Sequence, residues 1–151
     1  MRALIAIAAL AACTAQPQQQ DEASTEPLNA AAGTTAEESA LVQMPPWDGA
    51  REAGVDFRAV GQEPGWMVDI YSQDRIVALM DYGQSIATFP RPEPAYPQEG
   101  AIVYETEAGG RSLSITIRRF PCQDVMSGED YPATVEVVLD GRTLQGCGRS
   151  V

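Results

Sequence analysis

The chain has 151 residues, with 21 acidic residues against 10 basic ones, no histidine and a formal net charge of −11. Every basic residue is an arginine, so there is no lysine for a Schiff base or a Walker-type phosphate site, and no imidazole for a catalytic triad, a Cys–His pair or a conventional zinc site. The acidic balance also argues against nucleic acid and anionic membrane surfaces as partners, because both are bound through basic residues.

The first twelve residues have the features of a secretory signal. Arg2 is followed by ten small or aliphatic residues, about half of the ~20 that a membrane-spanning helix needs. The segment ends in Leu10-Ala-Ala-Cys13, which resembles the lipobox of bacterial lipoproteins. That resemblance implies cleavage before Cys13, acylation of this cysteine and, with Thr14 next to it, sorting to the outer membrane on its periplasmic side. An ordinary signal peptide with a chance cysteine is the alternative.

Residues 13–53 are expected to form a disordered acidic linker behind the lipidated cysteine. From residue 14 on they are rich in Gln, Ala, Thr, Ser, Glu and Pro, and they hold seven acids and one arginine. A self-repelling chain of this length extends roughly 30–40 Å, which would hold a domain clear of a lipid surface. Within the linker, Met44-Pro-Pro-Trp47 is either a docking segment or a patch that packs on the domain that follows.

The domain expected over residues 54–151 has a periodicity of two. Residues 111–119 alternate strictly, with Leu113, Ile115 and Ile117 on one face and polar residues on the other, which indicates a half-buried strand. Eight such segments are separated by turns: 57–60, 65–71, 75–82, 85–89, 101–106, 111–119, 133–139 and 142–147. Short strands joined by local turns predict an all-β fold, a small antiparallel β-barrel of seven to eight strands with lipocalin-like architecture.

Large side chains occupy the inward positions of these strands. They are Trp66, Ile70, Leu113, Ile115, Ile117, Val135 and Leu139. Because side chains only just fill the interior of an eight-stranded barrel, we expect a solid centre and any binding on a rim or a loop. Residues 90–97 include four prolines and are expected to run as a stiff flap across one end of the barrel.

Cys122 and Cys147 remain once Cys13 is lipidated. An exported protein enters an oxidising compartment, where an even pair of cysteines indicates a disulfide. A redox or metal role is the alternative, but the chain has no Cys-x-x-Cys motif and no histidine. The disulfide should stabilise the domain by about 3.5 kcal/mol.

Three short motifs of the domain together resemble a family of uncharacterised bacterial envelope lipoproteins. They are Phe57-x-Ala-x-Gly-x-Glu63-Pro64-Gly65-Trp66, Cys122-x-Asp124-x-Met126-Ser127-Gly128-x-x-Tyr131-Pro132 and Gly146-Cys147-Gly148. The resemblance spans residues 57–148 and implies an envelope location without an established activity. The Ser-Gly-x-x-Tyr loop is also similar to that of the membrane-bound inhibitors of C-type lysozyme, whose small barrel is a second candidate architecture. The short all-β domain is similar to META-type lipoproteins.

The inhibitor resemblance implies a loop that occupies the lysozyme cleft. Ser127, Gly128 and Tyr131 match this loop. The inhibitors use a nearby basic residue, usually a lysine, which is absent here, and Arg142 is the candidate to replace it. The candidate interaction loop of this chain comprises Asp124, Met126, Ser127, Gly128 and Tyr131.

These motifs also have structural interpretations. Glu63-Pro64-Gly65 is typical of a turn, after which Trp66 would plug one end of the barrel rather than stack on a ligand. Asp124, Ser127 and Asp130 have the spacing of side chains that bind nearby backbone N–H groups, an interpretation we favour over calcium binding.

The sequence thus predicts a non-catalytic periplasmic lipoprotein, anchored in the outer membrane, whose monomeric domain needs no cofactor or metal and binds a partner through the disulfide-pinned loop. Lysozyme or another envelope protein is the expected partner, since an acidic domain attracts a cationic one. A small-ligand barrel is the second hypothesis and requires a cavity of roughly 300 Å³ or more. A carboxylate hydrolase is the third. Glu105 and Glu107 share a strand face, but catalysis requires two carboxylates facing each other in a cleft at ~5–10 Å.

Overall fold

Alternating inward and outward side chains give residues 44–151 ten strands, eight of which form one antiparallel sheet. The computed structural model describes residues 44–151; the predicted signal, Cys13 and the linker up to residue 43 lie outside the described residues. The elements are α2 (Trp47–Ala50), β1 (Val55–Gly61), β2 (Trp66–Tyr71), β3 (Arg75–Met80), η1 (Asp81–Gly83), β4 (Ser85–Pro90), β5 (Ala101–Ala108), β6 (Arg111–Arg118), β7 (Cys122–Gln123), β8 (Asp130–Tyr131), β9 (Ala133–Leu139) and β10 (Arg142–Ser150).

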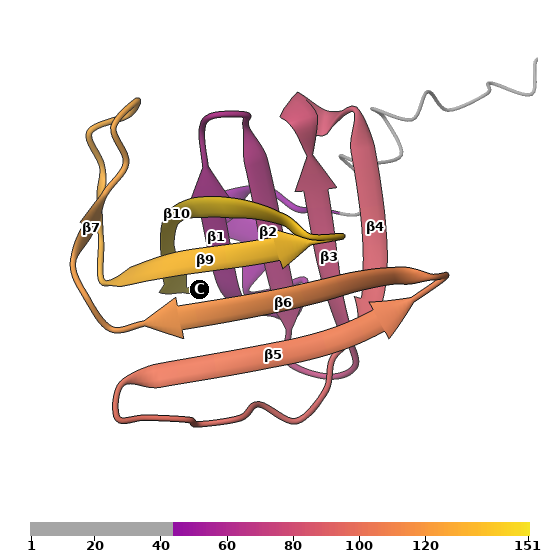
Figure 1. Ribbon diagram of the computed structural model, residues 1–151. Coiled ribbons are helices and arrows are strands. Elements are labelled where there is room, and N and C mark those ends of the chain that lie inside the picture. Colours follow the sequence, from indigo (N-terminus) through magenta and orange to yellow (C-terminus); the bar gives the residue numbers. More distant parts are fainter. Residues whose placement is uncertain (1–43) are drawn as a thin grey trace, which may run out of the picture. The chain divides into compact units, whose positions relative to one another are not determined.

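The eight long strands form a barrel that is nearly closed. Their order is β4-β3-β2-β1-β10-β9-β6-β5, so β1 to β4 pair in chain order, β5 pairs with β6, β6 with β9 and β9 with β10, and β10 returns to β1. The edge strands β4 and β5 are linked by Thr106, whose Oγ1 donates a hydrogen bond of 2.9 Å to the carbonyl of Pro90. In Figure 1, β1 to β4 form one layer, and β5, β6 and β9 cross it as the other. The predicted all-β class and eight-stranded antiparallel barrel are confirmed.

The centre of the barrel is filled by the inward side chains of its strands. All seven of the predicted inward residues are buried, and they belong to one apolar cluster. The most deeply buried members of this cluster, each no more than 2% exposed, include Val68, Ile70, Ile76, Phe89, Leu113, Ile115, Val135 and Val137. The expected solid centre is therefore present, filled by the buried side chains of the strands.

Two glycines of β10 allow the rings of Trp66 and Phe57 to pack against the backbone of this strand. A Cβ at Gly146 would lie 2.7 Å from Cζ2 of Trp66, and a Cβ at Gly148 would lie 2.5 Å from Cζ of Phe57. Real Cβ atoms do not approach other atoms so closely, so both rings rest against bare backbone. Cys147, between these glycines, points outward to its disulfide partner. Trp66 is 5% exposed and fills its end of the barrel, as predicted.

The folded part begins by Met44, ten residues before the boundary expected at residue 54. Residues 44–53, here called the strap, cover the outer face of β1 to β3. Met44 is 6% exposed and Ala50 is fully buried, and both belong to a second apolar cluster with Tyr71 and Val77. The side chains of Tyr71 and Val77 point away from the barrel centre and need another apolar layer to bury them. The strap supplies that layer, so the last ten residues of the expected linker belong to the domain.

A buried ion pair lies between the strap and the barrel wall. Nε and Nη2 of Arg58 on β1 donate hydrogen bonds to the two carboxylate oxygens of Asp69 on β2, at 2.6 and 2.7 Å. Nη2 also donates to the carbonyl of Pro45 in the strap at 2.6 Å. The side chains of Arg58 and Asp69 are 1% and 0% exposed. Arg58 therefore joins two strands and the strap through one guanidinium, a role that no sequence motif indicated.

The proline-rich connection lies along β5 instead of crossing a barrel end. Ala95 and Val103 exchange two backbone hydrogen bonds, of 2.8 and 2.9 Å. At the start of the connection, Nη1 of Arg91 donates to the carbonyls of Tyr71 and Ser72. The expected flap was wrong in its placement, because an open strand edge offers backbone partners that a barrel end does not.

Candidate functional site

The candidate interaction loop is the turn of a short hairpin, residues 122–131, here called the finger. Its two strands are β7 and β8, in which Cys122 pairs with Tyr131 and Gln123 with Asp130. The predicted disulfide between Cys122 and Cys147 is present and fixes the base of the finger to β10. Figure 1 shows the finger projecting from the barrel beyond β6 and β9.

The turn of the finger is held by its own polar groups. Asp124 Oδ1 accepts hydrogen bonds from the backbone N–H groups of Met126 and Ser127, at 2.9 and 3.4 Å. The N–H of Gly128, which has a φ of 72°, donates to the carbonyl of Asp124, and Ser127 Oγ accepts from the N–H of Glu129. Asp124 and Ser127 therefore bind backbone N–H groups, which is the structural interpretation of their spacing. Within the described residues, the third member of that set, Asp130, accepts instead from the side chain of Gln123.

The finger rests on an aromatic and cationic stack. Tyr131 is 5% exposed, and its hydroxyl donates a 3.0 Å hydrogen bond to Oε2 of Glu129. Arg149 of β10 donates to Oε1 of Glu129 at 2.5 Å, and its guanidinium lies 4.2 Å from the ring centre of Trp47 and 5.2 Å from that of Tyr131. Burial, followed by the hydrogen bond to Glu129, raises the pKa of Tyr131 to about 12. Tyr131 is thus an internal support of the finger.

The tip of the finger exposes two apolar side chains. Val125 is 86% exposed and Met126 is 70% exposed, although the backbone on either side of them is tied down by Asp124 and the disulfide. A single exposed apolar residue needs no explanation, but two neighbours at the tip of a hydrogen-bonded turn form a small exposed apolar surface. The exposure of Val125 was not predicted, because its position in the motif carries no fixed residue type.

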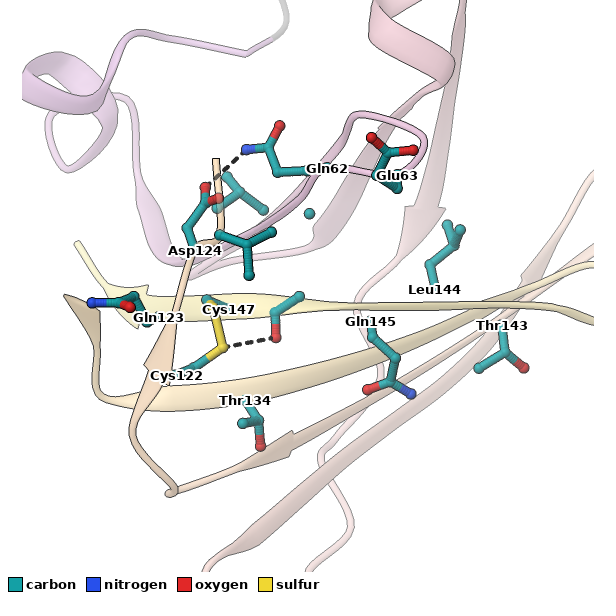
Figure 2. A pocket seen from close by; sticks show the side chains of 14 residues that line it. Gln62, Glu63, Cys122, Gln123, Asp124, Thr134, Thr143, Leu144, Gln145 and Cys147 are labelled. Atoms are coloured by element: carbon teal, nitrogen blue, oxygen red, sulfur yellow. Dashed lines mark hydrogen bonds between the residues drawn. A yellow bond between two sulfur atoms is a disulfide. The ribbon is translucent and has the colours of Figure 1, made fainter. Parts of the chain in front are cut away.

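A groove of about 560 Å³ runs beside the finger. The β1–β2 loop, the start of the finger and the outer side of β10 line it, as Figure 2 shows. Gln62 joins two of its walls through a 2.8 Å hydrogen bond from Nε2 to Oδ2 of Asp124. The remaining polar lining side chains are Glu63, Gln123, Thr134, Thr143 and Gln145. Since its charged side chains are both acidic, the groove suits a neutral or cationic group.

The other predicted site residues have structural positions. Glu63, Pro64 and Gly65 form the turn between β1 and β2, and the Glu63–Pro64 peptide bond is cis. Arg142 pairs with Asp81 of η1 at 3.0 Å, at the end of β10 away from the disulfide. The cation beside the finger is Arg149, which sequence reasoning missed because only the pairing of β1, β10 and the finger brings it there.

The carboxylate pair singled out in the sequence, Glu105 and Glu107, does not line the groove. Asp124 is engaged by Gln62 and by its own turn, and Glu105 and Glu107 are exposed on β5. In residues 44–151 no group of three or more His, Cys, Asp or Glu side chains could hold a metal ion.

Comparisons with known proteins found no matching family model, no matching curated protein and no matching solved structure. None of the helices between residues 44 and 151 combines the length and the hydropathy that crossing a bilayer requires. Function is consequently inferred from the finger and the groove themselves.

The finger is expected to loosen in acid. Burial alone would raise the pKa of Asp124, but hydrogen bonds from Met126, Gln62 and Ser127 outweigh it and lower that pKa below its ordinary value of 3.8. Hydrogen bonds from Arg149 and Tyr131 lower the pKa of Glu129 below 4.5. Carboxylates with lowered pKa values stabilise the fold above their ordinary range, and this contribution is lost as the pH falls through the lowered values.

Amide NMR shifts of Met126 and Ser127 should therefore stay constant from pH 7 down to about 4 and change only below it. Asp124→Asn keeps the shape of the side chain and should remove this acid transition at the two amides. A transition above pH 4.5 in the unmodified chain would contradict the lowered pKa values.

Proposed function

We propose that this protein is a non-catalytic interaction module, held at the outer membrane by a lipidated Cys13 and facing the periplasm, that binds a protein partner through the finger. The observation that carries the proposal is the exposure of Val125 and Met126 on a turn whose backbone is held by hydrogen bonds to Asp124. Binding at a rigid loop costs little conformational entropy, and exposed apolar side chains provide the central contacts of protein interfaces.

The groove gives the partner a second requirement. Its charged lining side chains, Glu63 and Asp124, are acidic, and the chain as a whole has a net charge of −11. A partner that places an apolar pocket over the tip and a basic side chain in the groove would satisfy both parts of the surface. Long-range attraction of such a cationic partner would also speed the encounter.

Site-specific photo-crosslinking in the native envelope tests the proposal. A photoreactive residue at Met126 is expected to give a discrete protein adduct, and the same residue at Tyr96, which is 69% exposed on the connection along β5, is expected not to. Val125→Ser in the Met126 probe should reduce the adduct several-fold, because it removes half of the apolar tip. Equal adducts from both positions, or an adduct insensitive to Val125→Ser, would count against the finger as the binding element.

Inhibition of C-type lysozyme is the narrower form of the proposal. Ser127 and Gly128 are exposed in the turn, and the finger carries a basic neighbour in Arg149. In a turbidity assay, slowing of lysozyme by micromolar protein, and relief of that slowing by Gly128→Val, would support this form. Undiminished lysis would leave the finger with a different envelope partner.

A further inference from the structure

The barrel has an apolar hollow at one of its ends, beside the start of β1 and away from Trp66. This hollow, here called the mouth, has a volume of about 530 Å³. Its apolar lining side chains are Phe57, Ile102, Tyr104, Ile117, Pro132 and Ala133. All of these except Pro132 belong to or contact the apolar cluster of the barrel. A volume of this size lies within the range of small-molecule sites.

Two arginines lie at the rim of the mouth: Arg119 lines it, and the guanidinium of Arg91 lies 5.9 Å from the ring centre of Tyr104. Arg119 forms no ion pair among the described residues, whereas Asp56, the acid on the same rim, is 3.4 Å from Arg91 and partly neutralised. Arg119 and Ile102 also line a neighbouring hollow of about 350 Å³ together with Glu99, but Glu99 and Arg119 form no ion pair. A guanidinium without an ion pair among the described residues thus lies beside an apolar floor, in a chain whose net charge is −11.

We propose that the mouth binds a small amphipathic carboxylate, with its acyl chain on the apolar floor and its carboxylate on Arg119. An anion would be repelled by the net charge of this domain unless a local cation offset it, and Arg119 is placed to do so. A guanidinium presents two parallel donors that match the two oxygens of one carboxylate. The solid centre below the floor stops a long chain from entering, which favours short and medium acyl chains.

This site is separate from the finger. The groove and the mouth have no lining residue in common, so the two proposals fail or succeed independently. The mouth also differs from the predicted small-ligand barrel, because its ligand would lie on the filled centre and not within it.

Titration of the full chain with decanoate below its micelle concentration tests the site. Cys13→Ser is included so that acyl groups on the protein do not compete. Methyl NMR signals of Ile102 and Ile117 are expected to shift saturably, while Ile76, fully buried in the centre, should not shift. Ala133→Leu should fill the mouth and abolish the shifts.

The charged contact is tested with two neighbouring arginines. Arg119→Gln should weaken decanoate binding about three- to tenfold and leave decanol binding unchanged, because an exposed charged contact contributes on that scale. Arg118→Gln makes the same change of charge next to the mouth and should have a smaller effect. No saturable shift, shifts at Ile76 equal to those at Ile102, or equal weakening by both substitutions would overturn the proposal. Arg119→Gln keeps the test valid if Ala133→Leu fails to fold.

Discussion

Asp69→Ala should destabilise the domain by about 3–5 kcal/mol, the largest loss we expect from a single substitution. The change removes both acceptors of Arg58 and leaves a guanidinium that is 1% exposed without a counter-charge. Burial raises the pKa of Asp69, and the hydrogen bonds and charge of Arg58 oppose that rise. Urea unfolding of the full chain, followed by circular dichroism, measures the loss.

The matched control removes the whole pair. Arg58→Met with Asp69→Leu replaces both charges by apolar side chains of similar size, and such replacements of buried pairs are often neutral or stabilising. We therefore expect the double variant to be clearly more stable than Asp69→Ala. If Asp69→Ala loses less than about 1 kcal/mol, the pair is not the buried contact that the structure shows.

Joint replacement of Cys122 and Cys147 by serine should cost about 3.5 kcal/mol, because the disulfide restricts the unfolded chain. A second effect should be local: the finger loses its covalent attachment to β10, so protease should cleave the chain first between residues 123 and 130. Cys13→Ser is the matched control and should change neither result. Equal unfolding midpoints for both variants would show that the hydrogen bonds of the turn and the core hold the domain without the disulfide.

The strands could be predicted because each carries its own pattern. Leu113, Ile115 and Ile117 alternate with polar residues, and turn residues separate the eight segments, so local sequence is enough to place them. The strap could not be placed in this way. Its composition is that of a linker, and the signal lay instead in Tyr71 and Val77, whose outward positions are apolar and require a cover.

The candidate site was predictable only in part. The disulfide follows from the even pair of cysteines, and the turn residues of the finger lie in one continuous motif, so Asp124 and Ser127 could be assigned their local hydrogen bonds. Arg149 and Trp47 lie far from the finger in the sequence, and only the assembled barrel brings them to Glu129 and Tyr131. The mouth and the position of Arg119 at its rim could not be predicted from the sequence, because a hollow depends on how side chains from several strands pack against one another.

The stack around Trp47 connects the finger to the strap. Arg58 and Arg149 lie 4.9 and 4.2 Å from the ring centre of Trp47, and Arg149 also donates a hydrogen bond to Glu129. Trp47 is only three residues from Met44, where the described chain begins. Met44 and Pro45 hold the strap on the barrel wall through Tyr71, Val77 and Arg58, so Trp47 keeps its place only while these contacts hold. A displacement of the strap would move this indole away from Arg149 and Tyr131, and the finger would lose part of its support.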